Sequence, residues 1–304
     1  MQYAKRSGDA WAFYTAGRDG DGARRLVMAR ELRGAIEHDQ LALYYQPKVF
    51  LPAGEVCGLE ALVRWRHPER GLVPPAEFIA LAEHTGLIKP LADWAVAAAL
   101  RQSRAWREAG LRLPIAVNLS VRNLQDPDLV PRVARLLRDH GAGGDWLEFE
   151  ITESAIMDDP ERALQTLRAL HELGIALHID DFGTGYSSLG YLQRLSVDAV
   201  KIDKSFVQGM LEDADSAVIV RSTITLAHDL GILAVAEGVE NEAVLERLLA
   251  KGCDIAQGYH IAKPMPAEEC REWLASCRWR LAEHRPLGRR QGQAARSRGD
   301  AHSR

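Results

Sequence analysis

Short apolar, β-branched runs alternate with longer stretches of helical period along most of the chain, from about residue 25 to residue 283. There are eight such runs: LALYYQPKV from Leu41, VCGLEALVRW from Val56, IAVNLS from Ile115, WLEFEIT from Trp146, ALHIDD from Ala176, AVKID from Ala199, LAVAEGV from Leu233 and a segment near Asp254 to His260. Eight strands that alternate with helices over about 250 residues are typical of a (β/α)8 barrel. The sequence therefore predicts an α/β fold, a TIM barrel.

Six stretches of helical period lie between these runs: Ala76 to His84, Leu91 to Ala109, Asp128 to His140, Pro160 to Leu173, Asp215 to Leu230 and Glu242 to Ala250. Asp159 and Asn241 stand immediately before two of them, where their side chains can cap a helix N-terminus. Only LPAGE, Leu51 to Glu55, separates the first two runs, and it has the composition of a hairpin turn. One strand is therefore predicted to run antiparallel, which makes the barrel irregular.

The composition is that of a globular protein, with 47% hydrophobic and 26% charged residues among 304. This excludes collagenous, coiled-coil and wholly disordered chains. No apolar stretch reaches the roughly 20 residues that a membrane-spanning helix needs, and no secretory segment opens the chain. The four cysteines, Cys57, Cys253, Cys270 and Cys277, include no CxxC pair. This is typical of buried thiols in a reducing compartment. We expect a cytoplasmic chain that makes no membrane contact of its own.

Both ends of the chain differ in composition from its body. Residues 284–304 carry six arginines against one acid and few large apolar side chains, so a disordered basic tail is predicted. Such a tail can be simply solvated or can contact nucleic acid or acidic lipid, but the acidic body argues against a nucleic-acid binder. Ala16 to Arg25, AGRDGDGARR, has the composition of a linker. The predicted segments are therefore 1–24, 25–283 and 284–304.

Polar residues cluster at the ends of the apolar runs. They are Glu60, Asn118, Glu150, Glu153, Asp180, Asp181, Lys201, Asp203, Glu237 and Gln257. One acid at a strand end is usually a helix cap or a solvated loop residue. Acids from several strands, however, converge on the mouth of a closed barrel and repel one another unless a cation is bound. Oxygen ligands without His or Cys favour Mg²⁺ or Mn²⁺ over Zn²⁺.

The adjacent pair Asp180 and Asp181 is the most informative part of this set. Where a strand turns into a loop, both side chains can reach one site, and one of them can bridge two ions about 4 Å apart, as in phosphate-ester hydrolysis. Lys201 could orient a water or hold a phosphate oxygen, or form only a structural salt bridge. Arg64 could reach a substrate phosphate or lie in a surface loop. The loop from Phe182 to Ser188 has glycines that permit close backbone approach, although an ordinary βα turn has similar residues.

Taken together, these segments resemble one known family. The stretch Glu60-Ala61-Leu62-Val63-Arg64-Trp65 is similar to the motif that names the EAL-domain family of bacterial cyclic-di-GMP phosphodiesterases. Further segments match the family in order: Tyr45-Gln46-Pro47, Asn118-Leu119-Ser120, Glu150-Ile151-Thr152-Glu153-Ser154, Asp180-Asp181-Phe182-Gly183-Thr184-Gly185, Lys201-Ile202-Asp203, Ala236-Glu237-Gly238-Val239-Glu240 and Gln257-Gly258-Tyr259. The resemblance covers about residues 26–280.

The resemblance implies a modified TIM barrel that linearises cyclic di-GMP to 5′-pGpG with two Mg²⁺ or Mn²⁺ ions, Ca²⁺ being inhibitory. Lys201 would orient the metal-bound attacking water, with Glu237 and Glu153 also counted as catalytic. The first ion would be held by Glu60, Asn118, Glu150 and Asp180, and the second by Asp180, Asp181 and Glu237. Substrate contacts would come from Gln46, Leu62, Arg64, Asn118, Asp203 and Gln257. No residue at a metal or lysine position departs from the family pattern.

The resemblance also bears on assembly. Glu153 would brace the loop from Phe182 to Leu189 and so couple metal occupancy to dimerisation. A homodimer is expected, with the loop after Asp181 and the helix starting near Ser205 as candidate interface segments. Residues 3–14 resemble the end of a GGDEF diguanylate-cyclase domain, although an amphipathic leader would also fit. The chain would then come from a GGDEF–EAL tandem protein that could be membrane-anchored through other parts.

Two other functions remain open from the sequence. One is a receptor that binds cyclic di-GMP without hydrolysing it and signals through a linker or a dimer partner. The other is a protein-interaction module that keeps the barrel without using its site.

Overall fold

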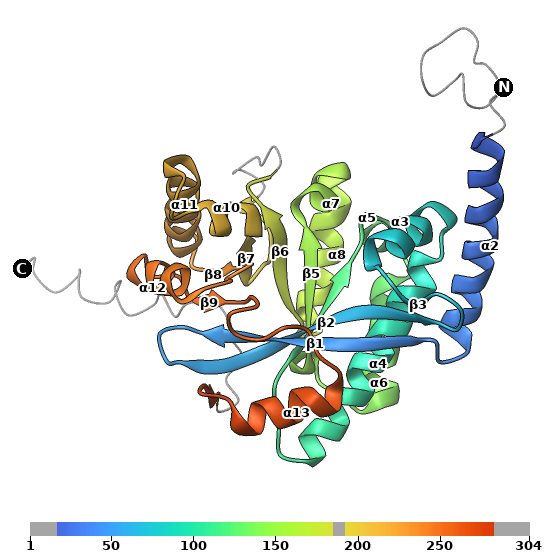
Figure 1. The fold of residues 1–304 in the computed structure, drawn as a ribbon, viewed down its shortest axis with the longest axis horizontal. Coiled ribbons are helices and arrows are strands. Elements are labelled where there is room, and N and C mark those ends of the chain that lie inside the picture. Colours follow the sequence, from blue (N-terminus) through green and yellow to red (C-terminus); the bar gives the residue numbers. More distant parts are fainter. Residues whose placement is uncertain (1–16, 185–191, 283–304) are drawn as a thin grey trace, which may run out of the picture.

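The fold was obtained as a computed structural model that describes residues 17–184 and 192–282 (Figure 1). Eight strands close into a ring in the order β1-β2-β4-β5-β6-β7-β8-β9, and β9 pairs back to β1. The strands are β1 Leu41–Phe50, β2 Glu55–His67, β4 Ile115–Leu119, β5 Leu147–Thr152, β6 Ala176–Phe182, β7 Ala199–Ile202, β8 Leu233–Ala236 and β9 Ile255–Ala256. Each of the eight apolar runs forms one strand, which confirms the predicted α/β barrel.

The irregularity of the barrel lies where it was predicted. Strand β1 is antiparallel to both neighbours, β2 and β9, whereas the other neighbours in the ring run parallel. A tight turn joins β1 to β2, in which the N–H of Gly54 donates to the carbonyl of Phe50 at 3.0 Å. Two further strands, β3 (Gly71–Val73) and β10 (Arg280–Leu281), pair with β2 outside the ring.

Helices cover the outside of the ring. They are α2 Gly17–Glu37, α3 Pro75–Thr85, α4 Ile88–Glu108, α5 Val121–Leu124, α6 Leu129–His140, α7 Glu153–Asp158, α8 Pro160–Glu172, α10 Lys204–Gly209, α11 Ala214–Asp229, α12 Glu242–Ala250 and α13 Ala267–Ser276, with a 3-10 turn η1 at Gly144–Trp146. All six predicted helices are present with ends within three residues of those expected. The side chains of Asp159 and Asn241 accept from the N–H groups of Arg162 and Val244, as helix caps should.

Helix α2 differs from the sequence prediction, because it begins at Gly17, inside the segment that has the composition of a linker. Its buried residues Leu32 and Ala35 pack against Trp65, Phe78 and Leu91 on the outer wall of the barrel. The glycine-rich start has a poor intrinsic tendency to form helix, so packing further along the helix supplies the stability that local sequence does not.

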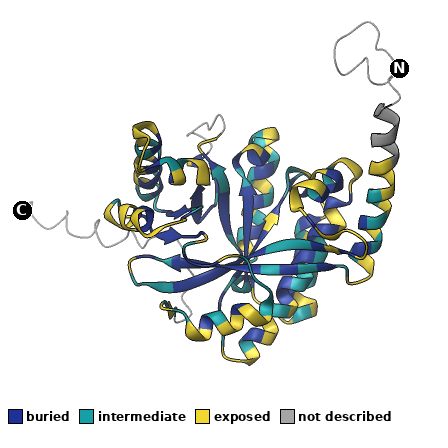
Figure 2. Cartoon of the chain, viewed as in Figure 1, coloured by how far each residue is buried: buried dark blue, intermediate teal, exposed yellow. Residues whose placement is uncertain are grey.

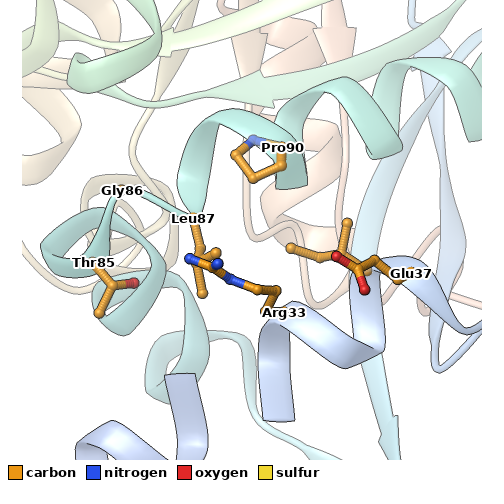
Figure 3. Close-up of a pocket in the computed structure, with 7 residues that line it drawn as sticks. Arg33, Glu37, Thr85, Gly86, Leu87 and Pro90 are labelled. Carbon is orange, nitrogen blue, oxygen red and sulfur yellow. The ribbon is translucent and has the colours of Figure 1, made fainter. Parts of the chain in front are cut away.

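A shallow cavity of about 280 Å³ lies between α2 and the turn that joins α3 to α4 (Figure 3). Arg33 and Glu37 line it from α2, and Thr85, Leu87 and Pro90 line it from the opposite side. Among the described residues, none of the predicted site residues belongs to this lining. The cavity is a feature of the outer wall and not of the strand ends.

The apolar core fills the space between the ring and its helices, so the strands are buried and the outer helix faces are exposed (Figure 2). Cys57, Cys253 and Cys270 are buried as predicted, and Cys277 is half-buried. Over residues 17–184 and 192–282, none of the helices combines the length and apolarity that a bilayer crossing requires.

Candidate functional site

The predicted site residues gather at one end of the barrel, because the parallel strands all end there. Glu60 lies in β2, Asn118 in β4 and Glu150 in β5, and the β-ladders place Asn118 directly beside Glu150. The remaining members follow from β6, β7 and the residues just after β8 and β9: Asp180, Asp181, Lys201, Glu237 and Gln257. Convergence of strand ends therefore brings together groups that are up to about two hundred positions apart in the chain.

Lys201 is the cation at the centre of this cluster. Its side chain is 1% exposed, and its Nζ lies 2.5 Å from Oε2 of Glu150, 2.7 Å from Oε1 of Glu237 and 3.2 Å from Oδ2 of Asp180. Burial opposes the charged form, but the surrounding carboxylates, Glu150 first, hold the pKa of Lys201 well above its ordinary value. The ammonium group thus stays protonated, and it faces carboxylates that come from β5, β6 and the residue after β8.

Glu60 is held from two sides by amides. One of its oxygens accepts from the side chain of Asn118 at 2.8 Å, and the other accepts from Gln257 at 2.6 Å. Gln257 also donates to Gln46 at 3.1 Å, and Gln46 donates to the carbonyl of Ala262 at 3.0 Å. Burial raises the pKa of Glu60, and the nearby charge of Glu150 adds to this. Two predicted substrate residues therefore orient a predicted metal ligand.

Asp180, Asp181 and Glu237 form the more open part of the site. One ligand oxygen from each lies within 4.8 Å of the others. Asp181 has a φ of 53°, a left-handed conformation that aspartate tolerates better than most residues, and its N–H donates to Oδ1 of Asp180 at 2.9 Å. This turn in the backbone is how both aspartates reach one site, as predicted.

Excess negative charge is the main electrostatic property of the site. Burial raises the pKa of Asp181, with Asp180 and Asp203 contributing, and burial raises the pKa of Glu237 to about 8 despite its contact with Lys201. If the carboxyl groups of Glu60, Glu150, Asp180, Asp181 and Glu237 all ionise when cations bind, Lys201 offsets one of the five negative charges, and two divalent cations would balance the other four. An all-oxygen donor set of this kind fits hard cations such as Mg²⁺ or Mn²⁺.

Glu153 stands apart from the carboxylate cluster. It is the first residue of α7, a helix capped by Thr152, and its carboxylate accepts from the N–H of Gly183 at 3.0 Å. Gly183 has a φ of 97°, which favours glycine at that position. Glu153 therefore ties α7 to the start of the loop after β6. The rest of that loop, residues 185–191, lies outside the described residues.

The predicted substrate residues outside the cluster have diverse surroundings. Arg64 is half-buried, donates to the carbonyl of Val63 at 3.0 Å, and has its guanidinium carbon 5.5 Å from the centre of the Tyr44 ring. Leu62, which is also half-buried, lies opposite Tyr44 in the β1–β2 ladder. Asp203 caps α10 by accepting from the N–H of Ser205 at 3.0 Å. These contacts leave their roles toward a ligand as predictions.

Sequence reasoning missed a second ionic layer inside the barrel, formed by Lys48, Glu148 and His178. Lys48 contacts Glu148 and lies 3.2 Å from Oε1 of Glu150, and all three residues of the layer are buried. Burial opposes its charge, yet Glu148 and then Glu150 raise the pKa of Lys48 above its ordinary value. The signal in the sequence was period two, since Glu148 precedes Glu150 by two residues and so lies on the same face of β5.

Comparisons with known proteins agree with this architecture. The family described as EAL domain matches residues 29–264. The bifunctional diguanylate cyclase/cyclic di-GMP phosphodiesterase MucR of Pseudomonas aeruginosa is 42% identical over 271 residues, which is 88% of this chain and 40% of MucR. The cyclic di-GMP phosphodiesterase PdeR of Escherichia coli is 42% identical over 248 residues, 82% of this chain and 37% of PdeR.

A solved structure of the PaMucR phosphodiesterase in complex with cyclic di-GMP superposes with a TM-score of 0.77 at 44% identity. The match covers 79% of this chain and 98% of that structure. The chain spans about two fifths of the length of MucR and of PdeR. Since the family match extends over nearly the whole barrel, and the solved relative has the same fold, the chain belongs to the EAL-domain family.

Proposed function

We propose that this chain is a cyclic-di-GMP phosphodiesterase that opens the ring of its substrate to give linear 5′-pGpG. The observation that carries the proposal is the set of converging carboxylates around the buried ammonium group of Lys201. Names of the relatives, cyclic di-GMP phosphodiesterase among them, support the choice of substrate.

Two divalent ions, Mg²⁺ or Mn²⁺, are part of the proposal. Glu60, Asn118, Glu150 and Asp180 would hold the first ion, and Asp180, Asp181 and Glu237 the second. When bound, such ions polarise a phosphoryl oxygen and lower the pKa of water enough for it to attack. The charge balance at the site supports this assignment, because two divalent ions compensate the excess of four carboxylates.

The chain's own residues would bind the substrate and orient the reacting groups. Lys201 donates from a fixed, buried position and would orient the attacking water or a phosphate oxygen in line with the bond to be broken. Arg64 would contact a substrate phosphate, while Gln46, Leu62, Asp203 and Gln257 would contact the rest of the dinucleotide. Since Gln257 already donates to Glu60, one residue would link substrate binding to a metal ligand.

Replacement of Lys201 tests the chemical step. In Lys201→Met we expect kcat to fall by about 10²- to 10⁴-fold with KM changed far less, because the role assigned is in the reaction and not in substrate binding. The measurement is chromatographic separation of cyclic di-GMP and pGpG after incubation in Mg²⁺, Mn²⁺, Ca²⁺ or chelator. Product should form with Mg²⁺ or Mn²⁺ only, since Ca²⁺ is expected to inhibit.

The matched control is Lys251→Met, which removes a lysine at the end of α12, away from the strand ends. It should keep wild-type turnover. Binding of cyclic di-GMP in Ca²⁺ without product in Mg²⁺ or Mn²⁺ would replace the enzyme with a receptor, and absence of binding would leave only an interaction module. A Lys201→Met variant that binds as poorly as it turns over would make Lys201 a substrate contact.

Further features of the proposal concern the longer protein. Three features stay predictions from the family resemblance. They are a homodimer through the segment after Asp181 and α10, a cytoplasmic location, and a preceding GGDEF domain ending in residues 3–14. The predicted domain boundaries at 24 and 283 stay predictions as well, and the basic tail lies outside the described residues. Sedimentation of the purified chain would test the dimer.

A further inference from the structure

Directly beneath the mouth of the barrel lies the ionic layer formed by Lys48, Glu148 and His178, from β1, β5 and β6. These side chains are almost completely removed from solvent, with exposures of 1%, 4% and 3%. Burying charged groups is costly unless they are paired. None of the three has a part in the proposed function, so their presence in the barrel interior calls for a physical reason.

The layer is joined to the site above it through one carboxylate. Lys48 lies 3.2 Å from Oε1 of Glu150, and Lys201 lies 2.5 Å from Oε2 of the same residue. Glu150 is itself 1% exposed. Glu150 therefore lies between two ammonium groups, with Lys48 near one carboxylate oxygen and Lys201 near the other. Its orientation is determined by the ionic layer as well as by the residues at the mouth.

The surroundings of Lys48 would suit a metal ion if the lysine were absent. One ligand atom each from Glu148, Glu150 and His178 lies within 4.8 Å of the others. Nδ1 of His178 is 3.8 Å from Glu148 and 3.9 Å from Glu150, and it is a buried polar atom with no hydrogen-bond partner among the residues that the structure describes. Two carboxylates and an imidazole nitrogen form a common donor set for divalent transition metals.

We propose that Lys48 is a positioning residue whose ammonium group serves as the permanent cation of this lower layer. It excludes a divalent ion from the cage of Glu148, Glu150 and His178, and it keeps Oε2 of Glu150 directed toward the mouth. The inference rests on the proposed function in one respect, since Glu150 is taken to be a metal ligand there. A lysine is suited to the task because its charge cannot be lost to chelation or exchange.

The test counts bound ions on the full 304-residue chain without substrate. In Lys48→Met, which keeps an unbranched side chain one atom shorter and removes the charge, equilibrium dialysis against Mn²⁺ or Co²⁺ should show one ion more per chain than wild type. The additional Co²⁺ should give a visible absorption band typical of a nitrogen and oxygen site. In Lys48→Met with His178→Leu, this gain should disappear. Lys251→Met should bind as many ions as wild type.

A second variant keeps the test decisive if Lys48→Met does not fold. Lys48→Met combined with Glu148→Gln removes one positive and one negative charge, so the layer stays balanced and the cage loses a ligand. A positioning role predicts that this variant binds no additional ion but loses about tenfold in affinity for Mn²⁺ at the mouth, the usual effect of losing an outer contact to a ligand.

The opposite results would overturn the inference. If folded Lys48→Met binds as many ions as wild type with the same affinity, or if the double variant keeps wild-type affinity, Lys48 is only a structural charge. Wild-type chain that binds metal but yields no pGpG would refute the proposed function and leave this inference standing on the ion counts. Wild-type chain that binds no divalent ion would refute both.

Discussion

Single charged residues in this protein are stabilised where several partners converge on them, and Asp126 is an example away from the site. It lies in the turn between α5 and α6 and is buried, with Oδ2 2.8 Å from Arg132 and Oδ1 3.2 Å from Lys89. Burial opposes its charge, but Arg132, the N–H of Asp128 and Lys89 together lower the pKa of Asp126 below its ordinary value. The turn is therefore fastened to α4 and α6 by one carboxylate.

This contact predicts a pH-dependent stability. A carboxylate with a lowered pKa in the folded state stabilises the fold at neutral pH, and the stabilisation is lost as the pH falls below the unfolded value of about 4. In Asp126→Asn we expect the free energy of unfolding at pH 7 to fall by about 1–3 kcal/mol. Urea unfolding at pH 7 and at pH 3.5 should show the gap to wild type narrowing in acid.

The control is Asp139→Asn, which removes an exposed carboxylate from α6. It should change the free energy of unfolding by no more than about 0.5 kcal/mol. A gap between Asp126→Asn and wild type that stays constant with pH would show that the side chain acts through packing and not through its charge.

At the scale of elements, two glycines differ in what surrounds them. Gly34 is inside helix α2, and a Cβ added there would meet nothing within 4 Å apart from the adjoining backbone of its own helix. Gly258 follows Gln257 at the end of β9, and a Cβ there would lie 2.2 Å from the backbone N and O of Val239. The second glycine lets two loops meet behind a residue of the site, whereas the first only weakens its helix.

Opposite effects of alanine are therefore expected at these two positions. Gly34→Ala should raise the free energy of unfolding by about 0.5–1 kcal/mol, since alanine loses less backbone entropy in a helix. Gly258→Ala should lower it by about 1–3 kcal/mol, because the backbone must shift to make room. Thermal and urea unfolding of both variants measure this. An unchanged free energy of unfolding in Gly34→Ala would mean that α2 has no share in stability, and a lower one would mean that a side chain is not accommodated at this position.

At the scale of the whole molecule, the barrel closes through a short seam. Strands β1 and β9 share only two residue pairs, whereas β4 and β5 share five. Side chains contribute to closure, because the bonds from Gln257 to Gln46 and Glu60 join β9 to β1 and β2. The proposed metal ligands come from β2, β4, β5, β6 and the residue after β8, so a bound ion would link five parts of the ring at its mouth.

Metal binding should thus stabilise the entire fold. At a free Mn²⁺ concentration 100 times the dissociation constant, a single site adds about 2.7 kcal/mol to the free energy of unfolding. The melting temperature should rise with Mn²⁺ or Mg²⁺ and return to its starting value with chelator. Asp180→Asn, which removes a charge from both proposed ion positions, should show a smaller rise. Equal melting temperatures with metal and with chelator would contradict metal binding at the mouth.

The sequence by itself determined the features that depend on local order along the chain. The short apolar, β-branched runs predict the strands, the caps Asp159 and Asn241 predict helix starts, and the five residues from Leu51 to Glu55 predict the antiparallel hairpin. The strand-end positions of the site residues also follow from the run boundaries. Each of these is decided by neighbours within a few residues, so no knowledge of the closed ring is needed.

Only the tertiary structure decided which distant groups meet. The bond from Gln257 to Glu60, the contact of Glu153 with Gly183 and the cage around Lys48 join residues far apart in sequence. Their partners are set by the closure and register of the ring, which no local pattern encodes. Helix α2 was also decided by the tertiary structure, because its packing on the barrel wall outweighs the low helix propensity of its glycine-rich start. Residue types thus predict the chemistry of the site, and the fold decides its geometry.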